Sequence, residues 1–259
     1  VVRHCDVELT EREWNSFHEL TRSIGQAYAI QQQARQNQNW AGVNRQENTL
    51  KKLSQERADI VKSAEGKISA LDSIIPHISH EEKTIVFCAD TPQLNDASRI
   101  LQSHTKNLRQ YSTTLGLTNE ELHQHLEEFN GDDAKYLVGI DCLNEGLDIK
   151  TCTTCILMSS SGSEREYIQR RGRILRLGGS IPIAHIYDMV VYPPSGLTPN
   201  DDNQNTIRAL LSHELRRSDV ICEAADNKQS IERHLDTRFT QLGTNLTNIR
   251  DYNAQRNQP

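Results

Sequence analysis

Short apolar segments that alternate with helical segments over residues 81–192 constrain the fold of this chain most. β-Branched and aromatic residues concentrate in five runs: TIVFCA (84–89), LRQYS (108–112), KYLVGI (135–140), TCILMS (154–159) and AHIYDMVVY (184–192). Helical patterns at 92–104 and 118–130 separate the first three runs. Strands that alternate with helices predict a parallel sheet, and near-continuous apolar strands predict burial on both faces. We therefore expect an α/β fold with helices on both faces of the sheet.

The regions before and after this core have helical rather than strand-like sequence patterns. Residues 1–80 read as a helical lead-in or insertion, because Thr10 and Glu13 have capping-box spacing and apolar residues then recur at helical intervals. Trp14 and Phe17 lie on that stripe, which favours core anchors over a base-stacking platform. Residues 193–259 follow as a helical extension with a polar tail. The predicted organisation is thus 1–80, 81–192 and 193–259.

The stretch SEREYIQRRGRILRLGG, residues 163–179, holds five arginines in a chain whose formal net charge is −6. Capping-box spacing at its start predicts a helix. On that helix Gln169, Arg173 and Arg176 fall at i, i+4 and i+7, so they share one face. Solvated faces usually mix lysine and glutamate, whereas guanidinium groups suit multidentate contacts with phosphate oxygens. The pattern indicates a phosphate-bearing partner.

The segment LVGIDCLNEGLDI, residues 137–149, places acidic residues directly after a buried strand. Asp141, Glu145 and Asp148 would lie at the carboxyl edge of the sheet, where parallel sheets bind their ligands. Gly146 would allow the backbone to approach a ligand closely. An ordinary strand–helix turn with acidic caps explains the same residues, and both interpretations stay open here.

Charge and cysteine content limit how this chain could bind nucleic acid, a metal or a membrane. A sequence pI of about 5.9 argues against nucleic-acid binding by bulk charge, so any such binding would be local and geometric. The six cysteines suit reduced thiols, and the Cys152–Cys155 pair reads as two small residues entering a buried strand rather than a metal site. We expect no bound metal in this chain, and no membrane partner, since no run reaches the length of a membrane span.

Three segments in a fixed order carry a family resemblance. KTIVFCAD, then GIDCLNEGLD, then QRRGRILR match motifs IV, V and VI of the second RecA-like domain of superfamily 2 helicases and translocases. The motif sequences EGLDI and YIQRRGRILR are most similar to those of the XPB-like and restriction-type DNA branch of the DEAD/DEAH enzymes. The resemblance covers roughly residues 7–230, and it implies a RecA-like parallel sheet with helical extensions at both ends.

The resemblance also implies roles for individual residues. Arg173 and Arg176 match arginine fingers that reach the ATP γ-phosphate, and Gln169 matches the residue that senses that phosphate or its water. Gly146 and Asp148 match positions on the nucleotide side of motif V. The positions that would face nucleic acid, through backbone and small polar groups, are Cys88, Ala89, Asp141 and Glu145.

Missing motifs are as informative as those present. The sequence has neither a Walker A phosphate loop nor a DExx box, and AEGKIS lacks the first glycine of such a loop. We therefore expect ATP and Mg²⁺ to be bound mainly by an N-terminal RecA-like domain upstream of Val1, and this chain alone to be inactive. The sequence differs from the family pattern at two places: motif V has Ile140, and helix 118–130 lacks an arginine. These differences leave details of the nucleic-acid contacts open.

The favoured function is the C-terminal motor domain of an ATP-dependent DNA helicase or translocase, an ATP hydrolase, with nuclease, defence or repair complexes as further partners. Such a protein would act at the nucleoid of a prokaryote or in a eukaryotic nucleus. The alternative is a non-catalytic RecA-like module that docks an anionic or protein partner. A flavin- or nucleotide-binding domain of another kind has less support, because no glycine-rich turn follows any predicted strand.

Overall fold

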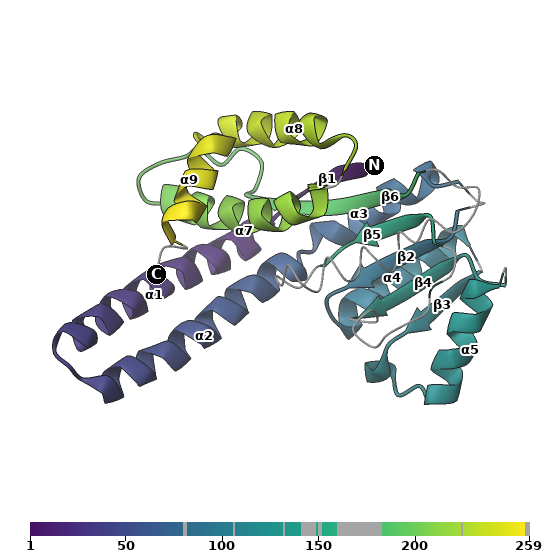
Figure 1. Cartoon of the computed structure of the whole chain (residues 1–259), viewed down its shortest axis with the longest axis horizontal. Coiled ribbons are helices and arrows are strands. Elements are labelled where there is room, and N and C mark those ends of the chain that lie inside the picture. The colour runs from purple at the N-terminus through teal and green to yellow at the C-terminus, as the bar shows by residue number, and fades with distance from the viewer. Residues whose placement is uncertain are drawn as a thin grey trace.

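The computed structural model describes residues 1–79, 82–105, 107–131, 133–140, 149, 152–159, 183–223 and 225–256. Within these ranges one six-stranded, wholly parallel sheet has the order β1-β6-β5-β2-β4-β3 (Figure 1). The five predicted strands are confirmed, and a sixth joins them. The strands are β1 (Val2–Glu8), β2 (Thr84–Cys88), β3 (Leu108–Tyr111), β4 (Tyr136–Ile140), β5 (Thr154–Leu157) and β6 (His185–Tyr192).

Strand β1 is the one clear departure from the sequence-based prediction. Residues 1–80 were expected to be helical, but Val2–Glu8 pairs with β6 in parallel, from Val2 opposite Ile186 to Glu8 opposite Tyr192. Polar residues occupy most positions of this segment, so its alternation is weak and only Val2 and Val7 are buried. Pairing with the long apolar β6 outweighs that weak local pattern, as is common at the edge of a sheet.

A long helical hairpin follows β1. Helices α1 (Glu11–Gln36) and α2 (Trp40–Lys62), which together we call the arm, extend away from the sheet (Figure 1). The predicted capping box is present, because Thr10 accepts the Glu13 N–H and Glu13 accepts the Thr10 N–H. Trp14 and Phe17 are buried where the arm meets the body, which confirms them as core residues.

Helices cover both faces of the sheet, as the sequence predicts. The crossover from β2 to β3 runs toward the β3 edge through α4 (Thr91–His104), and that from β3 to β4 runs back through α5 (Asn119–Asn130). Since parallel crossovers are right-handed, α4 and α5 lie on opposite faces. Helix α3 (Gly66–Ile74) packs beside α4, and a 3₁₀ turn over Ile75–His77 ends it at the predicted proline.

Three helices complete the described chain: α7 (Gln204–Cys222), α8 (Lys228–Gln241) and α9 (Leu246–Arg256). Helix α7 packs on β6, and α8 packs on β1. The C-terminal helices therefore cover the β1 edge of the sheet, which the sequence analysis did not predict. Arg250 of α9 donates to Asp219 and Glu232 at 2.8 Å each, which joins α9 to α7 and α8. None of the helices in the described ranges is long and apolar enough to cross a lipid bilayer.

A buried ion network fixes α7 against β6. Arg217 contacts Asp188 and donates to Glu214 at 3.0 Å and to the Met189 carbonyl at 2.9 Å. Glu214 also accepts the Val191 N–H at 2.8 Å. Burial alone would raise the pKa of Glu214, but the guanidinium of Arg217 holds that pKa well below its usual range. The carboxylates of Asp188 and Glu214 likewise outweigh burial and raise the pKa of Arg217.

Lys67 of α3 is a second buried cation near this network. Its side chain is 3% exposed, and its ammonium donates to the Lys62 carbonyl at 3.0 Å. Burial lowers the pKa of Lys67 to about 7, although the carboxylate of Glu214 partly opposes the shift. A lysine that is largely neutral in the folded protein and charged in the unfolded chain makes folding depend on pH.

Replacing Arg217 with methionine should destabilise the fold strongly. The change removes the guanidinium that contacts both buried carboxylates, so we expect the free energy of unfolding to fall by about 3–5 kcal/mol in urea titrations. The exposed neighbour Arg216 provides the matched control, and Arg216→Met should cost no more than about 0.5 kcal/mol. Equal losses for the two variants would contradict a central role of the network.

Lys67 should make stability rise with pH. Between the folded pKa of about 7 and the unfolded value near 10.5, the unfolded chain binds more protons, so the free energy of unfolding increases with pH across that window. Lys67→Met should remove this contribution, which is about 1 kcal/mol per pH unit. Urea titrations of both proteins at pH 7.5 and 8.5 would measure the difference, and identical slopes would show that Lys67 stays charged when folded.

Candidate functional site at the carboxyl edge of the sheet

The candidate site lies where β2, β4 and β5 end. Because every strand is parallel, these ends meet at one edge, with β2 between β5 and β4. The segment after Ile140 (141–148) and the segment after Ser159 (160–182) therefore begin on either side of β2. These two segments carry most of the predicted site residues, which lie outside the described residues: Asp141, Glu145, Gly146, Asp148, Gln169, Arg173 and Arg176.

The two predicted site residues that the structure describes lie at the end of β2: Cys88 is its last residue and Ala89 begins the loop that follows. Cys88 is buried, and the Ala89 N–H donates to the Gln93 side-chain oxygen at 2.8 Å. The amide nitrogen of Gln93 donates in turn to the Lys62 carbonyl at the end of α2, at 3.1 Å. The Ala89 amide is thus satisfied within the chain. A role for Cys88 and Ala89 in nucleic-acid binding stays a prediction.

Asp90 ties the same loop to α4 and to the arm. One carboxylate oxygen caps α4 by accepting the Gln93 N–H at 2.9 Å. The other accepts the hydroxyl of Ser63, the residue that follows α2, also at 2.9 Å. Gln93 and Asp90 therefore form two independent links between the edge of the sheet and the base of the arm.

Three hydroxyl groups, which we call the hydroxyl cluster, lie beside this loop. The Thr114 hydroxyl is 2.8 Å from the hydroxyls of both Thr91 and Ser112. Thr91 follows β2 and Ser112 follows β3, so their contact bridges the end of β4, where the segment 141–148 begins. Hydroxyl groups are common partners of nucleic-acid phosphates. Sequence reasoning did not single these residues out, although each lies within three residues of the end of a predicted strand.

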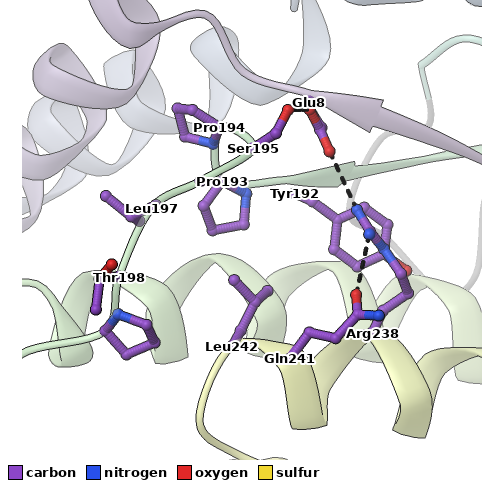
Figure 2. A pocket seen from close by; sticks show the side chains of 12 residues that line it. Glu8, Tyr192, Pro193, Pro194, Ser195, Leu197, Thr198, Arg238, Gln241 and Leu242 are labelled. Atoms are coloured by element: carbon purple, nitrogen blue, oxygen red, sulfur yellow. Dashed lines mark hydrogen bonds and ion pairs between the residues drawn. The ribbon is translucent and has the colours of Figure 1, made fainter.

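A hollow of about 470 Å³ lies at the carboxyl ends of β1 and β6 (Figure 2). Its walls are the proline-rich turn 193–199 and the end of α8. Figure 2 shows Arg238 directed toward Glu8 and Gln241, with hydrogen bonds of 3.3 and 3.2 Å. The guanidinium also lies 4.7 Å from the ring centroid of Tyr192. The charged groups that line the hollow, Arg238 and Glu8, therefore pair with each other. This pairing indicates a structural junction between β1, β6 and α8.

The CxxC cysteines are buried, as the sequence predicts. Cys155 lies in β5 and Cys152 just before it, and neither forms a disulfide within the described residues. Burial raises the pKa of the Cys152 thiol to about 12, so the thiolate that a metal or a redox reaction needs is disfavoured. In the part of the chain that the structure describes, no group of three or more His, Cys, Asp or Glu residues could hold a metal ion.

Comparisons with known proteins identify the class. Residues 66–178 match the helicase conserved C-terminal domain, a stretch that contains β2 to β5 and all three motifs. Residues 66–178 are therefore similar to the C-terminal domain of helicases. This class was predicted from the order of the three motifs, and the match confirms it.

Two curated relatives show what the chain is similar to. It is 31% identical to the DNA 3'-5' translocase XPB2 of Sulfurisphaera tokodaii over 121 residues, which are 47% of this chain and 26% of the relative. It is 29% identical to the ATP-dependent RNA helicase DRS1 of Phaeosphaeria nodorum over 147 residues, 53% of this chain and 17% of the relative. The chain thus spans about a quarter or less of the length of these relatives.

Solved structures with related folds are more distant. The C-terminal domain of the DEAD-box protein Dbp5 aligns with 59% of this chain and 80% of its own, at 19% identity and a TM-score of 0.44. The helicase domain of Pyrococcus furiosus Hef aligns with 69% of this chain and 36% of its own, at 18% identity and a TM-score of 0.38.

Asp90 should stabilise the edge of the sheet through its two hydrogen bonds. Asp90→Ala removes the cap of α4 and the link to Ser63, so we expect a loss of about 1–2 kcal/mol in the free energy of unfolding. Asp90→Asn keeps a side-chain oxygen at the cap and should lose less than half of that. Urea titration measures both, and equal losses would argue against the cap.

Proposed function

We propose that this chain is the C-terminal motor domain of an ATP-dependent DNA helicase or translocase. The observation that carries the proposal is the match of residues 66–178 to the helicase conserved C-terminal domain. The fold supports it, because motifs IV, V and VI follow three adjacent strands, β2, β4 and β5, at one edge of the sheet. Segments that begin side by side in this way are suited to contacting one ligand.

In this proposal Arg173 and Arg176 act as arginine fingers toward ATP bound in a cleft with a second domain. Their guanidinium groups would stabilise the charge that develops on the transferred phosphoryl group, and Gln169 would orient the attacking water. Asp148 and Gly146 would approach the nucleotide from the neighbouring segment. The β5–β6 connection that carries the fingers and the β4 connection that carries Asp148 start on either side of β2, which supports a shared role.

ATP and Mg²⁺ would be held mainly by an N-terminal RecA-like domain of the same protein. The sequence of this chain has no Walker A loop and no DExx box, which are the groups that cradle the phosphates and hold Mg²⁺ in such motors. Residues of this chain would complete the site from the other side of the cleft. Nucleotide-dependent closure of the two domains would then couple hydrolysis to movement along nucleic acid.

DNA is the proposed nucleic acid. The 31% identical relative is described as a DNA translocase, whereas the relative described as an RNA helicase is 29% identical. The wording of motifs V and VI also favours the DNA branch. The hydroxyl cluster would contact the phosphate backbone, because hydroxyl groups at this edge can donate hydrogen bonds to phosphate oxygens without reading sequence.

The arginine fingers can be tested in the protein that includes the N-terminal domain. Arg173→Ala should lower the kcat of DNA-stimulated ATP hydrolysis by about 10³-fold or more, because it removes stabilisation specific to the transition state. Binding of a fluorescent ATP analogue should change less than threefold. Arg171→Ala, which lies on the opposite side of the predicted helix from Gln169, Arg173 and Arg176, is the matched control and should keep kcat within threefold.

Turnover that survives Arg173→Ala and Arg176→Ala would refute the finger assignment. A native sequence without a Walker A lysine upstream would refute the motor itself and favour the non-catalytic binding module. The same ATPase assay with DNA and RNA of one sequence distinguishes the two nucleic acids, since DNA should stimulate hydrolysis more than RNA does.

A further inference from the structure

The outer part of the arm differs in charge from the rest of the protein. Residues 22–52, which we call the distal arm, hold five basic side chains and one acidic side chain, a formal charge of +4. The other 228 residues hold 24 basic and 34 acidic side chains, a formal charge of −10. The five basic residues are all exposed: Arg22, Arg35, Arg45, Lys51 and Lys52. Four of them, all except Lys52, make no ion pair within the described part of the chain.

Exposed apolar side chains concentrate in the same place. Tyr28 is 55% exposed, Ile30 52% and Trp40 65%. Across the described residues four large apolar side chains are exposed, and these are three of the four. The distal arm extends away from the sheet and the C-terminal helices, so neither of them covers this surface (Figure 1). Exposed aromatic residues that gather on one element mark a binding surface more often than chance exposure does.

The turn at the tip holds Trp40 in a defined position. Gln38 adopts a positive φ of 53°, and the Asn39 side chain caps α2 by accepting the Gly42 N–H at 3.0 Å. A Cβ at Gly42 would lie 2.9 Å from the Asn39 side chain, so that side chain packs tightly against the first turn of α2. Trp40 is the first residue of α2, directly after this cap. Because its backbone is fixed, only the two side-chain torsions of Trp40 lose freedom when the ring stacks on a ligand.

The remaining side chains of the distal arm suit a polar, anionic ligand. Eleven glutamines and asparagines fall within residues 26–48, and their amides can donate to phosphates or pair with base edges. Proteins that bind single strands combine a positive surface that follows the backbone with aromatic side chains on which bases stack. A duplex keeps its base faces stacked inside, so aromatic rings at the tip of an arm favour a single strand.

The base of the arm connects this surface to the edge of the sheet. Lys62 and Ser63, at the end of α2, bind Gln93 in the first turn of α4 and Asp90, its N-cap. The matched helicase domain begins at residue 66, so the arm precedes it in the chain. We propose that the distal arm binds single-stranded nucleic acid, with Trp40 and Tyr28 stacking on bases and Arg35, Arg45 and Lys51 contacting phosphates. The inference rests on the proposed function, because it extends that motor's grip on its strand.

Fluorescence anisotropy of a labelled 20-nucleotide oligothymidylate with the 259-residue chain tests this proposal. Between 50 and 200 mM NaCl, Arg35→Gln combined with Lys51→Gln should reduce the slope of log Kd against log salt by about 1.4, the value for two lost phosphate contacts on a single strand. Trp40→Ala should weaken binding about tenfold. Trp40→Phe should restore most of that loss, since it keeps an aromatic face.

Lys228→Gln combined with Arg233→Gln on α8 is the matched control, because it removes the same charge far from the arm. It should leave the slope unchanged and the affinity within twofold of the original chain. Thermal unfolding confirms that each variant is folded. A 20-base-pair blunt duplex should bind more weakly than the single strand and should be insensitive to Trp40→Ala.

Three results would overturn the proposal: no binding of the oligonucleotide at 50 mM NaCl, equal effects of the arm and control variants, or tighter binding of the duplex with no effect of Trp40→Ala. The first two results would leave a protein partner as the occupant of this surface. These outcomes are separate from the ATPase test, because the arm can fail while Arg173→Ala still abolishes turnover, and the reverse is equally observable.

Discussion

The ion network around Arg217 is the contact on which most of the described structure depends. It holds α7 against β6, and β6 is the strand on which β1 pairs in full register. The arm starts directly after β1 and rests on α7 through the hydrogen bond between His18 and Thr206. Strand β1 and the arm therefore both rest on the strand and helix that this network joins. A buried charge is a poor source of net stability but a strong penalty against wrong arrangements.

The loop after β2 has a comparable role at the other end of the arm. Its hydrogen bonds to Lys62 and Ser63 join two regions that the sequence separates by about thirty residues. The hydroxyl cluster lies directly beside this loop, because Thr91 is the first residue of α4. A ligand at the carboxyl edge would consequently lie close to the residues that hold the base of the arm.

Much of this architecture follows from local sequence, and the exceptions have physical causes. The five apolar strands and the capping box at Thr10 are local signals, and the structure contains them all. Strand β1 was missed because its stability comes from pairing with residues more than 180 positions away. The hydroxyl cluster was missed because Thr91 and Thr114 meet only when β3 lies beyond β4 in the sheet. The arginine segment rests on motif and spacing alone, since it lies outside the described residues.

The length of the arm gives it a mechanical property as well as a surface. With a rise of about 1.5 Å per residue, the 26 residues of α1 measure about 39 Å. A rotation of about 10° at the base would therefore move the tip by about 7 Å, more than the about 5.4 Å pitch of one helical turn. The side chains of Gln93 and Asp90 form the short end of this lever. Small displacements of the loop after β2 are thus geometrically amplified at Trp40.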